Sequence, residues 1–144
     1  MPSLAENPKA FYDYELIEKY EAGLVLQGFE VKAIHEHMMS LKGSYVKILG
    51  GELYLINAHI GAFQPANTPK DYDPTQTRKL LINKKELLHL FGKTQEKGLT
   101  LVPLRVYTKG PRIKLEFALA RGKKKYDKRE KIEKEQVRRD LRKL

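Results

Sequence analysis

The chain has 144 residues, no cysteine and a formal net charge of +10 at pH 7. This length predicts one domain with one hydrophobic core, and the lack of cysteine excludes disulfide frameworks, thiolate metal sites and thiol nucleophiles. Residues 1–6 do not resemble a signal peptide, and no stretch approaches the roughly 18 apolar residues of a membrane span. We therefore expect a cytoplasmic monomer with no membrane association.

The positive charge is concentrated at the C-terminus. Residues 121–144 hold 12 Lys or Arg against 5 Asp or Glu, which places +7 of the +10 there; residues 1–120 hold 16 against 13. Such a segment has too few large apolar side chains to offset the entropy cost of ordering it. We expect a folded domain of residues 1–121 and a basic C-terminal tail of residues 122–144 that is disordered alone and becomes helical against nucleic acid.

The sequence pattern of the first third of the chain predicts strands and one short helix. We expect a polar leader before Phe11, strands over residues 14–20 and 23–31 with bulges or bends at their glycines, and a short helix over residues 32–39. The strand predictions rest on alternating apolar and polar residues, and the helix on the spacing of Ile34 and Met38.

The middle of the chain contains a hairpin signal. Residues 44–49 and 52–60 flank Gly50 and Gly51, and Gly-Gly between two alternating runs is typical of a two-residue β-turn. A loop with three prolines follows over residues 61–77, and long loops of this kind are often functional or mobile.

The remaining elements are a helix and a second hairpin. Asn83 and Glu86 resemble a capping box before an apolar stripe that ends near Gly92. Residues 100–107 and 112–120 alternate on both sides of a turn, and Pro103 predicts an edge strand or a bulge. Together these elements predict a mainly β fold with short helices and about six antiparallel strands. The architecture that fits this set best is a closed barrel of the oligonucleotide-binding (OB) type.

Catalytic signatures are absent from the sequence. It contains no phosphate loop, dinucleotide-binding glycine motif, zinc-protease motif or nucleophile elbow. His35 and His37 would point about 200° apart on a helix and could not share a metal ion, and Asp71 and Asp73 are ordinary turn residues. We expect a binding protein without catalytic residues, metal or cofactor.

Several residues are candidates for nucleic-acid contact. Arg78 and Lys79 precede an apolar run and could reach phosphates, although an ordinary surface pair is an equal reading. Glu21, between two predicted strands, is read as a turn residue. Aromatic residues could stack on bases or simply pack the sheet: Tyr45, Tyr54, Phe63, Tyr107 and Tyr126.

Five motifs together resemble the SsrA-binding protein family, also called small protein B. They are Glu21-Ala22-Gly23, Gly28-Phe29-Glu30-Val31-Lys32, Arg78-Lys79-Leu80-Leu81, Lys97-Gly98-Leu99-Thr100 before Pro103, and Gly122-Lys123-Lys124 with Asp127-Lys128-Arg129. The resemblance covers residues from about Asn7 to the C-terminus, with the motifs in the order and spacing of the family.

The resemblance implies a role in trans-translation. The family has an OB-type barrel that binds the tRNA-like domain of transfer-messenger RNA (tmRNA, or SsrA RNA) and helps deliver it, with elongation factor Tu, to stalled ribosomes. The implied RNA-binding residues are Asn7, Glu21, Lys32, Arg78, Lys79 and Leu81. The implied ribosome-contacting residues of the tail, which would probe the empty mRNA channel at the decoding site, are Gly122, Lys123, Lys124, Tyr126, Asp127, Lys128 and Arg129.

The sequence departs from the family at several positions. Phe11 and Tyr12 stand where Arg-His is common, Ala33 and His35 lie where Ser and Arg are frequent, and Gln76 replaces a frequent Arg. Fewer phosphate contacts are therefore expected from the domain. Two other functions remain open on the residues alone, a generic OB-fold RNA-binding module and a ribosome-associated structural protein.

Overall fold

The computed structural model describes residues 2–123. The predictions for Lys124, Tyr126, Asp127, Lys128 and Arg129 lie outside the described residues. The elements of the described part are, in chain order, β1 (Ser3–Glu6), α1 (Pro8–Asp13), β2 (Tyr14–Leu24), α2 (Gly28–His35), β3 (Met39–Ser40), β4 (Tyr45–Leu49), β5 (Glu52–Ile56), β6 (His59–Ile60), the 3₁₀ turn η1 (Pro65–Asn67), β7 (Arg78–Leu81), α3 (Lys84–Thr94), β8 (Leu99–Lys109) and β9 (Arg112–Gly122).

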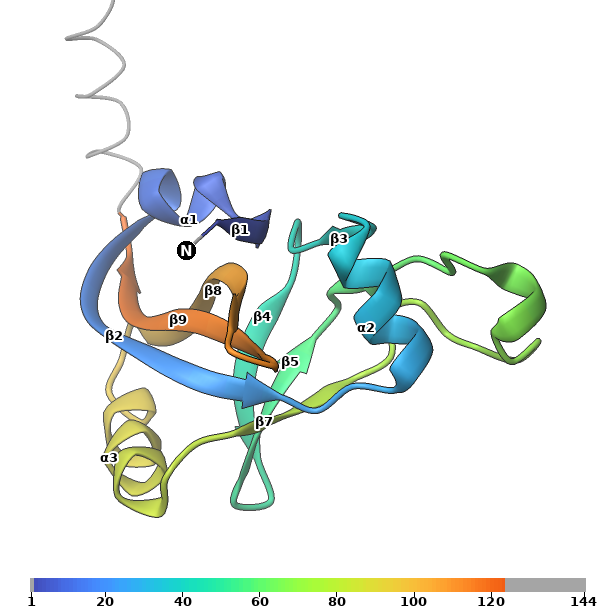
Figure 1. The fold of residues 1–144 in the computed structure, drawn as a ribbon. Coiled ribbons are helices and arrows are strands. Elements are labelled where there is room, and N and C mark those ends of the chain that lie inside the picture. Colours follow the sequence, from blue (N-terminus) through green and yellow to red (C-terminus); the bar gives the residue numbers. More distant parts are fainter. Residues whose placement is uncertain (1, 124–144) are drawn as a thin grey trace, which may run out of the picture.

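Six of the strands form a ring of antiparallel pairings. The order is β8-β4-β5-β7-β2-β9, and a further pairing of β9 with β8 connects the two ends. β1 adds to β8 outside this ring, while β3 and β6 form a separate two-stranded sheet. Figure 1 shows α1 and α3 at opposite ends of the strands and α2 on one side. The mainly β prediction is confirmed.

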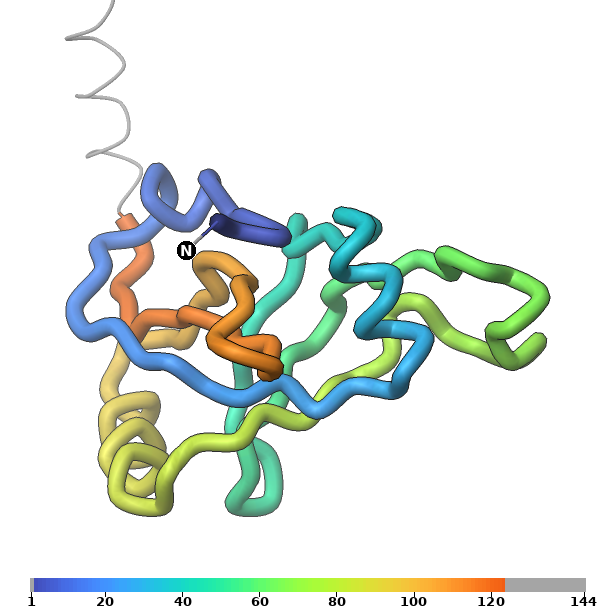
Figure 2. The backbone as a smooth tube through the Cα atoms, in the orientation of Figure 1, coloured from blue at the N-terminus to red at the C-terminus, as the bar shows by residue number. Residues whose placement is uncertain are grey.

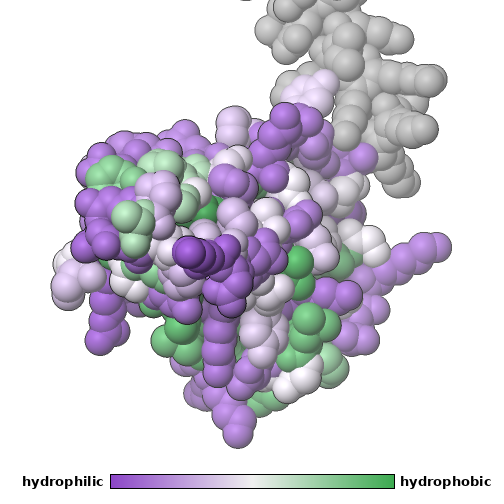
Figure 3. Space-filling view, turned by 90° about the vertical axis from the view of Figure 1, so that its right-hand side faces the viewer, coloured by the Kyte–Doolittle hydropathy of each residue, from purple (hydrophilic) through white to green (hydrophobic). Residues whose placement is uncertain are grey.

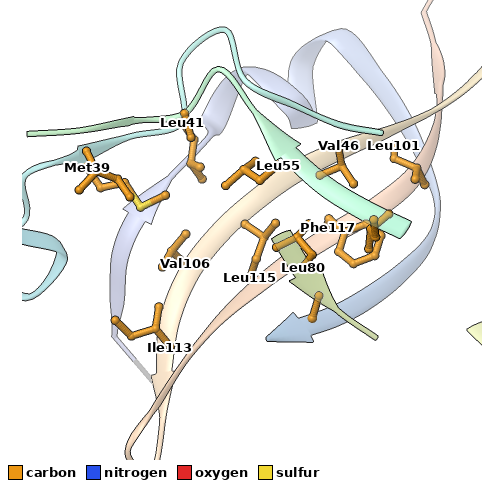
Figure 4. Close-up of a cluster of buried hydrophobic side chains, with 14 of the residues drawn as sticks. Met39, Leu41, Val46, Leu55, Leu80, Leu101, Val106, Ile113, Leu115 and Phe117 are labelled. Carbon is orange, nitrogen blue, oxygen red and sulfur yellow. The ribbon is translucent and has the colours of Figure 1, made fainter. Parts of the chain in front are cut away.

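The core lies inside the ring. Side chains from β4, β5, β7, β8 and β9 converge there, with the large ring of Phe117 among leucines and valines (Figure 4). Phe117, Leu55, Leu115 and Val106 are completely buried. Alternate residues of each strand point into this core, which leaves the intervening residues on the outer face of the sheet.

The hairpins and the capped helix are confirmed, but the strand predicted over residues 52–60 divides into β5 and β6, and β6 pairs with β3 in the separate sheet. Gly50 and Gly51 both have positive φ, 57° and 77°, in the β4–β5 turn, as the Gly-Gly signal predicts. The Asn83 side chain accepts a hydrogen bond from the Glu86 backbone N–H at 2.8 Å and caps α3. A bulge lies between Pro103 and Arg105 in β8, but β8 is not an edge strand because it pairs with β1, β4 and β9.

The N-terminal third differs from the sequence prediction. The prediction of a polar leader is wrong, because these residues form β1 and the start of α1. β1 forms by backbone pairing with β8. The strand over residues 23–31 is also wrong: β2 ends at Leu24, and α2 begins at Gly28. Gln27 and Glu30 form a reciprocal capping box at this helix start, which stabilises helix over a continued strand.

The loop of residues 61–77 projects beside α2, away from the strands (Figure 2). It contains η1 but no strand, as the proline-rich composition predicts. Its base is fastened to the body, because the Ile60 backbone N–H donates to the Pro74 carbonyl oxygen at 2.9 Å. At the other end of the described chain, the Lys123 backbone N–H donates to Asp13 at 3.0 Å, so the body continues through this residue.

Candidate nucleic-acid interface

The predicted RNA-binding residues Glu21 of β2 and Leu81 of β7 lie on the outer face of the sheet, close to Gly23. In the strand register Gly23 faces Leu81 of β7 on one side and Lys114 of β9 on the other. A Cβ atom added to Gly23 would lie 3.5 Å from Leu81 Cβ and 3.8 Å from Lys114 Nζ. The missing side chain therefore leaves a low point between an exposed leucine and a cation, open to the backbone or base of a ligand.

A shallow cleft adjoins this low point. Its volume is about 400 Å³, and its lining combines apolar side chains with two cations. Leu81 is 56% exposed at its rim, and Arg112 and Lys114 supply the positive charge. An apolar floor with cations at its border suits a nucleic acid, because the cations can meet phosphates while the floor contacts sugars or base faces.

Glu21 is held in place by β8. The Tyr107 hydroxyl donates a hydrogen bond to one carboxylate oxygen of Glu21, and Lys109 Nζ lies 3.3 Å from the other. The hydrogen bond from Tyr107 is the main cause that holds the pKa of Glu21 below its usual range, with Lys109 adding to the effect. The carboxylate is ionised at neutral pH and can accept hydrogen bonds from base amino groups.

Tyr107 is itself fixed by its surroundings. It is buried, and the Arg105 guanidinium lies over its ring at 4.4 Å from the centroid. Arg105 is also paired with Glu116 at 3.7 Å. Burial, followed by the hydrogen bond to Glu21, raises the pKa of the Tyr107 hydroxyl, which therefore stays protonated as a donor.

Lys79 and Leu81 share the outer face of β7. The alternation along this strand exposes these two side chains and buries Arg78 and Leu80. Lys79 Nζ lies 3.1 Å from Glu52 Oε1 in an exposed pair. An exposed ion pair of this kind is worth at most about 1 kcal/mol, so a phosphate can compete for the lysine.

Arg78 has a different position from the one expected of a phosphate contact. It is 3% exposed, and its guanidinium donates to Glu30 at 2.7 Å and 3.0 Å. The remaining hydrogen bonds go to the carbonyl oxygens of Ala58 and Pro74, at 2.5 Å and 2.9 Å, and to the Tyr72 hydroxyl at 3.0 Å. Each of its three guanidinium nitrogens therefore donates to an acceptor inside the protein.

Asn7 and Lys32 do not line the cleft beside Gly23. The Asn7 side chain donates to the Pro103 carbonyl oxygen at 2.9 Å, which places it on β8, two strands from β2 in the ring. Lys32 is exposed on α2. Gly122 ends β9, and Lys123 Nζ lies 3.5 Å from the Phe11 carbonyl oxygen. The structure thus brings Glu21, Lys79 and Leu81 to one face and leaves Asn7 and Lys32 elsewhere.

Lys114 and Arg112 of this face were not predicted from the sequence as part of such a site. Tyr107 was considered as a base-stacking or packing residue, but not as a buried donor to Glu21. Lys114 could have been found from its strand pattern, because it alternates with the core residues Ile113 and Leu115 and must point outward. Tyr107 had no such signal, since its contact with Glu21 joins residues 86 positions apart.

Among residues 2–123, no group of three or more His, Asp or Glu side chains is arranged to hold a metal ion. None of the helices described there is sufficiently long and apolar to span a membrane.

Comparison with known proteins gives consistent matches over nearly the whole chain. The family model for SmpB protein matches residues 4–144. An SsrA-binding protein of Sulfurihydrogenibium sp. (strain YO3AOP1) is 51% identical over 97% of this chain and 91% of its own length. Another, of Carboxydothermus hydrogenoformans, is 49% identical over 97% of this chain and 93% of its own.

The fold matches as well. A solved structure described as "tmRNA-SmpB: a journey to the center of the bacterial ribosome" superposes with a TM-score of 0.68 at 45% sequence identity, covering 94% of this chain and 95% of that one. The five sequence motifs, the ring of strands and these matches agree, and the chain belongs to the SmpB family.

Proposed function

We propose that this protein binds the tRNA-like domain of tmRNA and brings it to stalled ribosomes in trans-translation. The observation that carries this proposal is that relatives named SsrA-binding protein align over 97% of the chain at 49% to 51% identity. Elongation factor Tu would take part indirectly, through the charged tmRNA. The role is one of binding and positioning, and it assigns no catalytic residue.

The RNA-binding surface would be the outer face around Gly23. There Glu21 accepts hydrogen bonds from base amino groups, Leu81 contacts an apolar part of the RNA, and Lys79 and Lys114 meet phosphates. Asn7 and Lys32 would extend the contact beyond this face. Arg78 would act through Lys79, its neighbour in β7, by fixing the strand and the loop base.

The finer fold assignment belongs to the same proposal. The pairing of β8 with β9 connects the ends of the six-strand ring, which supports a closed barrel of the OB type. Such barrels bind nucleic acids on an outer sheet face and its adjoining loops.

The basic tail, which was predicted as residues 122–144 and whose first two residues end the described body, would read the state of the ribosome. Its excess of positive charge suits a groove lined by rRNA phosphates, which is vacant only when the message has ended. Gly122, Lys123, Lys124, Tyr126, Asp127, Lys128 and Arg129 would contact rRNA at the decoding centre and in the mRNA channel. A message still in the channel would exclude the tail sterically.

The proposal is tested by sequencing the RNA that copurifies with the full chain at moderate salt. One dominant RNA with a tRNA-like end is expected for the wild type, and Glu21→Gln with Leu81→Ala should reduce its yield. Lys93→Gln, on the remote surface of α3, is the matched control. A mixture of unrelated single strands would favour a generic RNA-binding module, and stoichiometric rRNA of one subunit would favour a ribosomal structural protein.

A further inference from the structure

A second cleft lies between α2 and the loop of residues 61–77, and it shares no lining residue with the cleft beside Gly23. Its volume is about 340 Å³, close to the lower end of the roughly 300–1,000 Å³ of small-ligand sites. One wall comes from the outer side of α2 and the other from the start of the loop; the lining residues are Gly28, Phe29, Lys32, Phe63, Gln64 and Asn67. Figure 3 faces the side of the molecule from which this loop projects, where hydrophilic residues predominate and hydrophobic ones form separate patches.

The helix wall of this cleft is anchored to buried groups. The Phe29 ring packs edge-on against the Tyr72 ring, with centroids 4.8 Å apart and planes at 89°. The Tyr72 hydroxyl lies 3.0 Å from Glu30 Oε2 and 2.9 Å from the Ile60 carbonyl oxygen. Arg78, through its bonds to Glu30 and Pro74, joins the helix to the base of the loop. The helix wall is therefore fixed to the residues that flank the loop base, Ile60, Tyr72 and Pro74, before any ligand binds.

The loop wall presents unused hydrogen-bonding groups. Asn67 Nδ2 donates to Gln64 Oε1 at 3.0 Å. This contact orients the two side-chain amides and leaves the Gln64 amino group as a donor and the Asn67 carbonyl oxygen as an acceptor. A neighbouring donor and acceptor match the Watson–Crick edge of an unpaired base, as in single-stranded RNA recognition.

The remaining lining groups suit the rest of a nucleotide. Phe63 is 38% exposed and offers a ring face for stacking. Lys32 adds a positive charge, and the lining contains no Asp or Glu. By contrast, the larger cleft of about 530 Å³ beside α1 has two acids, Glu6 and Asp13, in its lining together with Lys9 and Lys42, so its charges balance.

We propose that the cleft between α2 and the loop binds one unpaired RNA nucleotide, with the base between the Phe63 ring and the Gln64–Asn67 amide pair and the phosphate at Lys32. This inference rests on the proposed function, because it assigns a second contact for the same RNA. It gives Lys32, which does not line the cleft beside Gly23, a defined partner.

The test measures the affinity of the full-length protein for a transcribed tRNA-like domain. Phe63→Ala should weaken binding by roughly 5- to 150-fold, the effect of losing one base–aromatic stack, whereas Phe63→Tyr should retain binding. Phe91→Ala, which removes an aromatic ring of similar exposure from α3, is the matched control and should have no effect. In chemical probing, one nucleotide protected by the wild type should become reactive with Phe63→Ala.

The outcomes separate the two proposals. If Glu21→Gln weakens binding while Phe63→Ala leaves affinity and protection unchanged, the cleft does not hold a nucleotide and the proposed function stands. If the wild type does not bind the tRNA-like RNA, the proposed function fails. Whether the cleft binds a nucleotide is then tested with a short single-stranded RNA of mixed sequence. Equal affinity of the wild type and Phe63→Ala for this RNA would overturn the inference.

Discussion

Arg78 and Glu30 form an ion pair across the base of the loop, with Arg78 Nη2 2.7 Å from Glu30 Oε2 and side chains only 2% and 1% exposed. The residues are 48 positions apart, and the pair connects α2 to β7. The same carboxylate also accepts from the Gln27 backbone N–H at 3.1 Å, so Glu30 caps the helix as well. One buried pair thus fixes the start of α2, the loop base and the strand that carries Lys79.

Removal of the arginine should strongly destabilise the fold. Arg78→Met leaves Glu30 buried without its partner, and breaking such a pair typically costs about 3–5 kcal/mol of unfolding free energy. Urea denaturation measures this loss. Lys79→Met is the matched control: it breaks the exposed pair with Glu52 and should change stability by less than about 1 kcal/mol. Equal effects of the two variants would contradict the structural role of Arg78.

This pair also shows what the sequence could and could not predict. The turns at Gly50-Gly51 and Gly110 and the cap at Asn83 were predictable because the residues that define them are neighbours in the chain. The burial of Arg78 was not, because a cation next to Lys79 looks the same whether its partner is solvent, a phosphate or a distant glutamate.

The N-terminal elements were predicted wrongly for a related reason. β1 has only four residues, Ser3–Glu6, which are too few to show a strand pattern, and backbone pairing with β8 decides their structure. The candidate site also contains a part that could be predicted from the sequence and a part that could not. Glu21 and Leu81 were assigned from the family motifs, whereas the contacts of Glu21 with Tyr107 and of Gly23 with Lys114 follow from strand register.

Lys79 should account for part of the salt dependence of RNA binding. In the proposed complex its ammonium group meets a phosphate, so Lys79→Gln should flatten the slope of log affinity against log salt by about one unit. Titrations at several salt concentrations measure this slope. Lys93→Gln removes an equal charge from α3, where the lysine lies 3.5 Å from Glu96, and should leave it unchanged. A slope equal to that of the wild type would remove Lys79 from the interface.

Tyr107→Phe should shift the pH dependence of RNA binding. Without the tyrosine hydroxyl, the pKa of Glu21 rises toward the ordinary glutamate value of about 4.3, because the largest cause of its lowering is gone. Protonation removes acceptor capacity, so the affinity of this variant should fall at a higher pH than that of the wild type. RNA titrations between pH 6 and pH 4 are the measurement, and the shared RNA contributes equally to both curves.

The charges that face Glu21 keep the direction of this shift unambiguous. Lys109 on β8 and Lys114 on β9 continue to favour the carboxylate in the variant, while Glu116 lies opposite Glu21 in the β2–β9 register. The lowered pKa of Glu21 also links the stability of the fold to pH. This contribution to the free energy of unfolding is present above the unfolded-state pKa of Glu21 and is lost as the pH falls through its folded-state pKa. Glu21→Gln should abolish the difference between Tyr and Phe at position 107; a persistent difference would mean that Tyr107 acts through another group.

Deletion of residues 130–144 should separate RNA binding from ribosome rescue. The proposed RNA contacts lie on the described body, so the affinity for the tRNA-like domain should stay within about threefold of the full-length value. Tagging of stalled peptides in a reconstituted translation system should be lost, because six Lys or Arg residues proposed to meet rRNA phosphates are removed. A chain of full length with these six residues changed to Gln should fail in the same way, whereas substitution of Lys84 and Lys85 on α3 should not. If the deletion instead removed RNA affinity, the tail would belong to the tmRNA interface, and the assignment of the two tasks to body and tail would be wrong.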